Sequence, residues 1–322
     1  MKRFLPVPLL TGLLLVIAIG ALTAPAFADD PGEGSNEDIL IVYVTPLLSM
    51  SPDWSRSHDA FMNAAREYGF EGRVVGPNEI NIEEMVADIE TAIAEGADGI
   101  ITCPLVPEAF EEVLQKARDA GILVVNVMAD CCEDNRLTFI GTDPVALGQA
   151  QAEAVIDHSS GEAKVGIIMT DATTPNQKAE LEMFIETIED TGVELVDIQY
   201  DHSQVSEAVE KSAAMLMAHP EIDYLVCLEG ACPNGVGLTI EEMGLVGKVN
   251  VLAIDLQPGT IDYIKSGVIW ASFTQSYYNI DGGGVMAADV FVDYWRDGTL
   301  PPLFIDSGYN FWTVENVDEY GK

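Results

Sequence analysis

The sequence predicts an α/β protein made of two similar lobes, each a doubly wound, Rossmann-like parallel sheet. Two observations lead to this fold class. Short apolar, β-branched runs alternate with longer amphipathic stretches along nearly the whole chain, and the same alternation begins again after Asp143. No low-complexity linker separates the halves, and about 290 residues after a leader segment suffice for two domains of ordinary size.

The first half is expected to contain four strands and the helices between them. The strands are ILIVYV from residue 39, RVVG from 73, GIIT from 99 and ILVVNV from 122. A helix is predicted where apolar residues recur three and four positions apart, as do Ile82, Met85, Val86, Ile89 and Ile93. Strands that alternate with helices in this way form parallel sheets.

The second half repeats the pattern. Its expected strands are KVGIIM from 164, VELVDIQY from 193, YLVCL from 224, VNVLAI from 249 and VIWASF from 268, with helices near 175–191, 204–218, 233–243 and 257–266. Open α/β sheets bind ligands outside the carboxyl ends of their strands. Two lobes with those ends facing each other would therefore hold a ligand in the cleft between them.

The first 28 residues have the features of a secretory signal peptide. Lys2 and Arg3 precede an apolar run that ends in Ala26-Phe27-Ala28, which predicts cleavage after Ala28. A membrane anchor is the alternative, but the apolar run is short for a span. The first cysteine is Cys103, far from the cleavage site, so we expect no lipid anchor and a free protein in the periplasm.

The charge limits the class of partner. Without Lys2 and Arg3 the chain carries 13 basic and 53 acidic residues, a net charge of about −40. Nucleic acids and anionic membrane surfaces repel such a protein. The acids are spread over every helix, which indicates a solvated acidic surface rather than a cation-attracting patch.

Candidate site residues lie at the ends of the predicted strands. They are Trp54 with Asp53 in the turn after the first strand, Cys103 in Thr102-Cys103-Pro104, Asp130, residues 171–177, Glu229, Asp255 and Gln275. Several motifs stand in the same order: Ser51-Pro52-Asp53-Trp54, GADGIITCP from 96, GILVV from 121, FIGTD from 139, AHPEIDYLVCLEG from 218, VLAID ending at 255 and ASFTQ ending at 275.

In this order and spacing the chain resembles the sugar-binding, ribose-binding-like group of periplasmic substrate-binding proteins that serve ABC importers. The resemblance covers about residues 39–318. It implies lobes of 39–143 plus 276–301 and of 144–275 plus 302–322, joined by three crossings near 143, 275 and 302. It further implies a monomer that closes over a small neutral sugar or polyol and delivers it to a membrane permease. A ligand-presenting sensor for a membrane receptor is the alternative role.

The resemblance assigns roles to single residues. Trp54 would stack on a sugar ring, unless it is a partly buried helix-start residue. Asp255 and Gln275 would hydrogen-bond ligand hydroxyls from the second lobe and its hinge. Asp130 lies two residues beyond Met128, where many relatives carry an acid. It would contact the ligand from the first lobe, the alternative being a solvent-facing loop acid.

Three departures from the family pattern bear on the ligand. Relatives have an Arg where this chain has Glu180, an Asn-Asp pair where it has Glu229-Gly230, and often an Arg at Ala129. The loss of bidentate donors disfavours an anion and leaves a neutral sugar, a polyol or a cationic small molecule. Asn176, Gln177 and Lys178 would supply replacement donors, or simply begin a helix.

The pattern of the five cysteines and four histidines predicts no metal site, no bound cofactor and no catalytic activity. A disulfide between Cys103 and Cys131 or Cys132 is sterically plausible at neighbouring strand ends. Cys227 and Cys232 would form a second pair, although we prefer Cys227 as a small buried hydrophobe. The histidines are scattered, and no nucleophile elbow, phosphate loop or standard zinc spacing occurs, so an enzyme is not expected.

Overall fold

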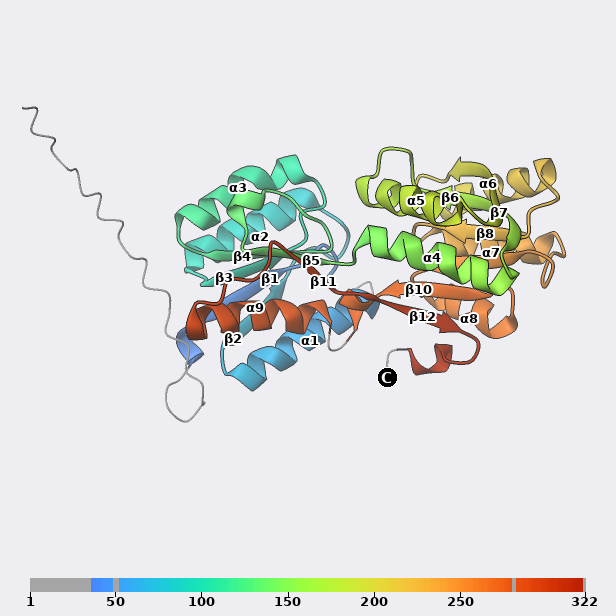
Figure 1. Ribbon diagram of the computed structural model, residues 1–322. Coiled ribbons are helices and arrows are strands. Elements are labelled where there is room, and N and C mark those ends of the chain that lie inside the picture. The colour runs from blue at the N-terminus through green and yellow to red at the C-terminus, as the bar shows by residue number, and fades with distance from the viewer. Residues whose placement is uncertain (1–35, 49–51, 280–281, 321–322) are drawn as a thin grey trace, which may run out of the picture.

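The computed structural model describes residues 36–48, 52–279 and 282–320, which form two α/β lobes (Figure 1). The first sheet contains β1 (Leu40–Val44), β2 (Glu71–Val75), β3 (Gly99–Thr102), β4 (Leu123–Val127), β5 (Thr138–Gly141) and β11 (Phe304–Asp306). The second contains β6 (Glu162–Met169), β7 (Gly192–Tyr200), β8 (Tyr224–Cys227), β9 (Asn250–Ile254), β10 (Ala271–Gln275) and β12 (Tyr309–Thr313).

The two sheets have the same strand order. It is β11-β5-β4-β3-β1-β2 in the first and β12-β10-β9-β8-β6-β7 in the second. Neighbouring strands are parallel, except that β12 runs antiparallel to β10. The repeated order confirms the predicted fold of two doubly wound parallel-sheet lobes.

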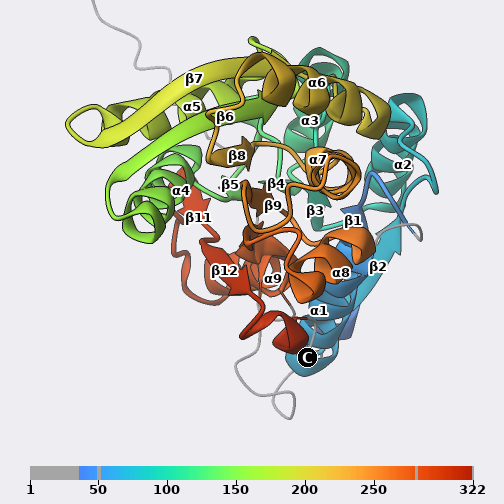
Figure 2. The same ribbon diagram turned by 90° about the vertical axis from the view of Figure 1, so that its right-hand side faces the viewer.

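Helices cover both faces of each sheet, as the end-on view in Figure 2 shows. In the first lobe, α1 (Pro52–Tyr68) and α9 (Gly283–Asp297) pack on one face, and α2 (Ile82–Glu95) and α3 (Pro107–Asp119) on the other. In the second, α4 (Pro144–Ser159) and α5 (Pro175–Ile188) pack opposite α6 (Val205–Ala218), α7 (Cys232–Glu242) and α8 (Pro258–Ser266).

The side chains of β1 show why its sequence is apolar throughout. Ile41 and Tyr43 belong to the core under α1 and α9, whereas Val42 and Val44 belong to the core under α2 and α3. Successive strand residues point to opposite faces. A strand buried on both faces therefore reads as a continuous apolar run, which is the pattern used to predict it.

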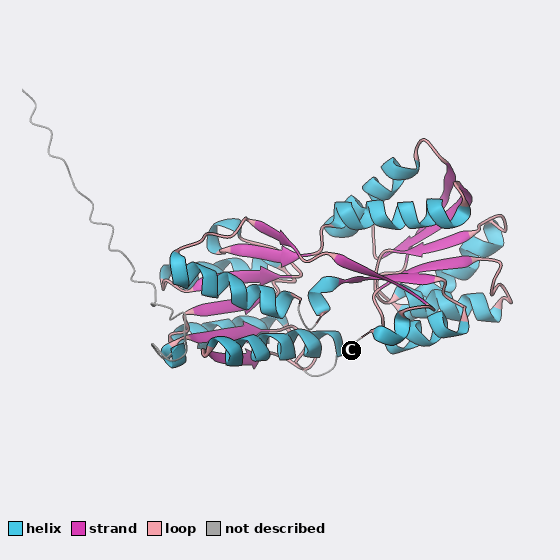
Figure 3. Ribbon diagram, turned by 60° about the horizontal axis from the view of Figure 1, so that its bottom comes forward, coloured by secondary structure: helices cyan, strands magenta, loops and turns pink. Residues whose placement is uncertain are grey.

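Three segments connect the lobes (Figures 1 and 3). One joins β5 to α4, the second leads from β10 through the 3₁₀ turn Ser276–Tyr278 to α9, and the third joins β11 to β12. We expected the third near residue 302. That boundary is wrong by about five residues, because β11 pairs with β5 of the first sheet through Ile305 and Ile140.

The three connecting segments are hydrogen-bonded to one another. Thr142 Oγ1 donates to the Gly308 carbonyl oxygen at 2.9 Å, and the Ser307 N–H donates to the Gly141 carbonyl at 2.8 Å. The Ser276 N–H donates to the same Gly308 carbonyl at 3.0 Å. Gly308 has a φ of 72°, a conformation that favours glycine. These contacts hold the three connections together at the junction of the lobes.

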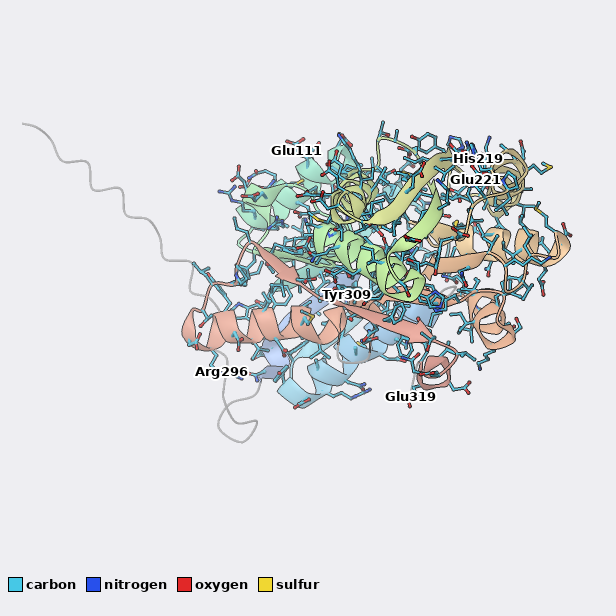
Figure 4. The ribbon with its side chains drawn as sticks, turned by 45° about the vertical axis from the view of Figure 1, so that its right-hand side comes forward. Glu111, His219, Glu221, Arg296, Tyr309 and Glu319 are labelled. Carbon is cyan, nitrogen blue, oxygen red and sulfur yellow. A yellow bond between two sulfur atoms is a disulfide. The ribbon has the colours of Figure 1, made fainter. Side chains whose placement is uncertain are left out.

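The predicted signal peptide lies outside the described residues. Within the described ranges, no helix is both long and apolar enough to cross a membrane. The exposed acids Glu111, Glu221 and Glu319 belong to different parts of the chain and lie on separate regions of the surface (Figure 4). Their dispersal agrees with a generally acidic surface.

Candidate ligand-binding cleft

A cavity of about 470 Å³ lies at the carboxyl ends of the second lobe's strands, next to the hinge. Most of its lining comes from the second lobe and the connecting segments, and Leu105 contributes from the first lobe. Its volume is in the range of small-molecule sites. The lining residues are Leu105, Thr142, Pro144, Leu147, Thr170, Asn176, Gln177, Glu180, Ser203, Leu228, Glu229, Gly230, Ile254, Asp255, Gln275 and Tyr278.

Asp255 stands one residue past the end of β9 in a left-handed conformation, with φ of 60°. The Asp255 N–H donates to the Phe273 carbonyl at 2.7 Å, and Ser272 Oγ donates to the Asp255 carbonyl at 2.9 Å, so β10 holds both backbone polar groups of the residue. Left-handed backbone at a non-glycine residue costs about 1 to 3 kcal/mol and often marks functional positions. Here it accompanies a carboxylate that lines the cavity.

Glu229 lies in the turn between β8 and α7 and is only 8 % exposed. Its Oε2 accepts the Ala231 N–H at 2.8 Å, while its Oε1 has no hydrogen-bond partner in the described part of the chain. Burial, together with the neighbouring Asp201 carboxyl, raises the pKa of Glu229 to about 7. The turn is bracketed by a disulfide between Cys227 and Cys232.

Glu180 reaches the cavity from α5 and is 3 % exposed. Burial raises its pKa well above the usual value, and the nearby Asp255 carboxyl adds to the shift. Its helix packs closely on α4, because a Cβ at Gly148 would lie 2.1 Å from the Glu180 carbonyl oxygen. Gly148 thus lets α5 approach near enough to place Glu180 at the cavity.

Neutral polar groups complete the lining. The Gln177 amide is fixed by two bonds to Thr170, since its Oε1 accepts the Thr170 N–H at 2.8 Å and its Nε2 donates to Thr170 Oγ1 at 2.9 Å. Ser203 Oγ is hydrogen-bonded to Thr170 Oγ1 at 2.9 Å. Asn176 at the start of α5 and Gln275 at the end of β10 add two amides.

Comparisons with known proteins agree with this architecture. The family model described as "Periplasmic binding protein domain" matches residues 41–298. The chain belongs to this family. A xylose/arabinose-binding protein of Sulfolobus acidocaldarius is 26 % identical over 251 residues, which are 73 % of this chain and 61 % of that protein. The match thus spans less than two thirds of the relative's length.

Two solved structures resemble this periplasmic binding protein in fold. A glucose-galactose binding protein from Geobacillus stearothermophilus has a TM-score of 0.74 and 25 % identity, and the match covers 86 % of this chain and 98 % of that one. An arabinose binding protein from the same organism has a TM-score of 0.81 and 22 % identity, over 88 % of this chain and all of that one.

Five of the nine residues predicted for the site line the cavity of this periplasmic binding protein. They share a location at strand ends or in the first half of α5 in the second lobe, and they are Asn176, Glu180, Glu229, Asp255 and Gln275. Gln177, a predicted donor, lines the cavity as well. Thr170, Ser203 and Tyr278 were not predicted, although each lies within a few residues of a predicted strand end, which was the signal available in the sequence.

Trp54 is 7 % exposed and packs behind an aromatic residue that lines the cavity. Its ring centroid is 5.7 Å from that of the cavity-lining Tyr278 and 6.1 Å from that of the fully buried Tyr277. In this conformation Trp54 supports the wall of the cleft, and its stacking on a sugar stays a prediction. The side chain of Asp53 lies outside the described residues.

Asp130 does not line the cavity in this conformation. Arg136 holds its carboxylate in a bidentate ion pair, with Nε to Oδ1 and Nη2 to Oδ2 both at 2.6 Å, and Asn126 Nδ2 donates to Oδ1 at 3.2 Å. A ligand would have to displace these donors. The structural counterpart of Asp255 in the first lobe is instead Met128, one residue past β4 with a φ of 62°.

The cysteine pairings differ from those expected. Cys227 and Cys232 form a disulfide, so the preference for Cys227 as a mere hydrophobe is wrong. Cys103, Cys131 and Cys132 are free, which contradicts the proposed bridge to Cys103. Cys103 is fully buried in the first-lobe core, where burial raises its pKa to about 12, so its side chain does not meet the cleft.

One group of potential metal-binding side chains occurs in the described part of the chain. Asp201, Glu229 and Cys232 place ligand atoms within 4.8 Å of one another. However, the Cys232 sulfur is bonded to Cys227 and cannot act as a thiolate. Two carboxyl groups alone fit a metal centre poorly.

Proposed function

We propose that this protein is the solute-binding component of an ABC importer and that it binds a monosaccharide or polyol in the cleft by hinge closure. The observation that carries the proposal is the cavity itself. Convergent carboxyl, amide and hydroxyl groups line it at the strand ends of one lobe, beside a three-segment hinge, in a member of the periplasmic binding protein family. The relatives and solved structures named above carry sugar-binding names.

The lining suits a compact molecule with many hydroxyl groups. The Asp255 carboxylate can accept from hydroxyls, and the Gln275 amide can both accept and donate. The Gln177 amide is already held in place by Thr170, so it loses little entropy on binding. Leu147, Leu228 and Ile254 supply apolar contact for the C–H faces of a ring. A carboxylate bond to a hydroxyl is charge-assisted and stronger than a neutral bond, so these groups can replace the water that a sugar gives up.

Closure would complete the site. In the present conformation the first lobe adds only Leu105 to the described lining, apart from the connecting segments. Rotation about the hinge would bring more of the first lobe onto the ligand, which then stabilises the closed state by its differential affinity for it. A membrane permease that recognises the closed form would receive loaded protein and ignore empty protein. No chemical step is needed.

The leader and charge support a periplasmic site of action. A signal peptide at residues 1–28 would export the chain, and the acidic surface would keep it soluble and monomeric. The neutral-ligand and cationic-ligand versions of the proposal make the same demands on export, hinge and permease. They differ only in the chemical groups of the ligand that the cleft binds.

Thermal unfolding of residues 29–322 against sugars, polyols and their amino derivatives tests the proposal. A ligand at a hundredfold its dissociation constant adds about 2.7 kcal/mol to the free energy of unfolding, enough to raise the midpoint by a few degrees. We expect such a rise with at least one ligand of these classes, and a decrease in radius of gyration by X-ray scattering. If no such compound shifts the midpoint, the proposed ligand class is wrong.

A further inference from the structure

The cleft concentrates negative charge without a matching cation. Glu180, Glu229 and Asp255 line the cavity, and Asp201 lies fully buried beside Glu229. Among the described residues that line the cavity, none is Lys, Arg or His. Glu180 has Asp255 as its acidic neighbour and Glu229 has Asp201. Buried acids are normally paired with a cation or with several hydrogen-bond donors.

The two glutamates are buried acids without a basic partner in the described part of the chain. Glu180 is 3 % exposed and is hydrogen-bonded by Gln151, and Glu229 is 8 % exposed and shares a hydrogen bond with Asp201. Both side chains line the cavity. Burying a carboxylate without a compensating charge costs free energy that a bound cation recovers. The arrangement therefore favours a ligand that brings N–H or O–H groups to this wall.

Charge decides between those two kinds of donor. A neutral hydroxyl can satisfy one oxygen but brings no charge, so the carboxyl beside it keeps its raised pKa, and closure would bury the acids more deeply. An ammonium group donates up to three hydrogen bonds and compensates the negative charge at the same time. Burial raises the pKa of both glutamates, and the neighbouring Asp255 and Asp201 carboxyls add to the shift, so the neutral form of each is favoured. A bound ammonium ion would lower these pKa values and favour the charged carboxylates.

We infer that the ligand of this cleft is a hydroxylated molecule with a primary or secondary amino group, and that Glu180 and Glu229 bind this group as an ammonium ion. The inference rests on the proposed function and specifies its substrate class. The hydroxyl groups would meet Gln177, Gln275 and Asp255, and the carbon skeleton would lie against the apolar part of the lining.

Two other cations fit the cleft less well. A bare metal ion would fill a small part of a cavity of about 470 Å³, and the one group of carboxyl and sulfur atoms within 4.8 Å in the described residues includes the disulfide-bonded Cys232 but neither Glu180 nor Asp255. A quaternary ammonium group is bound by a cage of aromatic rings. Here Tyr278 is the aromatic residue among the described lining, whereas hydrogen-bond acceptors are plentiful.

Matched ligand pairs test this assignment. Isothermal titration of the mature protein would compare amino sugars and aminocyclitols with their hydroxyl counterparts and with their N-acetyl derivatives, at a pH where the free amine is protonated. We expect the amine to bind at least tenfold more tightly than its neutral counterpart, and N-acetylation to abolish this advantage because it removes the charge.

Three variants connect the preference to the two glutamates. Glu180→Gln and Glu229→Gln keep the side-chain shape but remove the negative charge, and each should reduce the ratio of amine to neutral affinity by tenfold or more. Glu186→Gln, an exposed position on the same helix α5, serves as the matched control and should leave the ratio unchanged. Both affinities in the ratio are measured on the same folded variant. A general loss of stability would therefore not change the ratio of amine to neutral affinity.

The outcomes separate the inference from the proposed function. Equal or tighter binding of the neutral counterparts would overturn the amino assignment and leave the sugar-binding proposal intact. Ratios that the two variants do not change would also overturn it, since the charge selectivity would then arise elsewhere. Binding of neither class would contradict both proposals, and saturable Ca²⁺ or Mg²⁺ binding that Glu229→Gln abolishes, without amine binding, would replace the ammonium by a metal ion.

Discussion

At the scale of single residues, Asp255 combines two roles that a pair of substitutions separates. Its backbone is left-handed, which Asn tolerates better than Ala, and its carboxylate lines the cavity. We expect Asp255→Asn to keep the unfolding midpoint near that of the wild type but to weaken ligand binding about tenfold or more, the cost of a charge-assisted bond.

Asp255→Ala should weaken binding similarly and also lower the free energy of unfolding by about 1 kcal/mol, because Ala adopts this conformation at a cost. Titration calorimetry and thermal unfolding on the same two variants measure both effects. If Asp255→Asn binds the ligand as tightly as the wild type, Asp255 is not a ligand contact and the strand-end assignment fails at this position.

The sequence predicts the position of a residue where the fold alone determines it. Gln275 ends a buried strand, and Glu229 and Asp255 stand one or two residues past one; parallel strands bring such ends to one edge of the sheet. Asp130 follows the same rule but has Arg136 six residues later, and this ion pair depends on side-chain packing that no periodicity reports. Glu180 was found through its departure from a family pattern.

At the scale of elements, the disulfide between Cys227 and Cys232 holds the β8–α7 turn that presents Glu229. Replacing both residues by Ala should lower the free energy of unfolding by about 2 kcal/mol, as expected for a short closed loop. It should also weaken ligand binding, because the turn would sample more conformations before binding. Denaturant titration and calorimetry with and without reductant measure the two losses.

The matched control for the disulfide is Cys131→Ala with Cys132→Ala, which removes two free cysteines and leaves the bridge. Reductant should destabilise this control as much as the wild type and should leave the Cys227 and Cys232 variant unchanged. Loss of stability without loss of affinity would mean that α7 packing, and not the bridge, positions Glu229. The sequence allowed this pairing, but it could not distinguish it from a buried thiol.

At the scale of the whole molecule, the repeated strand–helix alternation was sufficient to predict two lobes. Each lobe buries its strands on both faces, and such strands are visible in the sequence as continuous apolar runs. The third crossing was misplaced for the opposite reason. The strand β11 has three residues, of which Phe304 and Asp306 are exposed, so no apolar pattern distinguishes it from a loop. Only its pairing with β5 shows that the first lobe extends past residue 302.

The two lobes should respond to acid in opposite directions. In the first lobe, burial lowers the pKa of His58 to about 4, below its unfolded value of 6.5. The unfolded chain therefore binds more protons between these values, and the stability that neutral His58 contributes is lost as pH falls through that window. In the second lobe, the pKa of Glu229 is raised to about 7 from 4.5, so its contribution is largest below pH 4.5 and is lost as pH rises through 7.

Two variants separate the opposing contributions of His58 and Glu229 to the pH dependence of stability in the ligand-free protein. Relative to His58→Gln, the wild type should lose about 2 kcal/mol of unfolding free energy between pH 7 and pH 5, since each unit of pKa difference corresponds to about 1.4 kcal/mol. Relative to Glu229→Gln, it should gain stability over the same interval. Urea titrations at both pH values measure the differences. If all three proteins have the same pH dependence, neither side chain changes its proton affinity on folding. The electrostatic argument that Glu229 is a buried acid without a compensating charge would then fail.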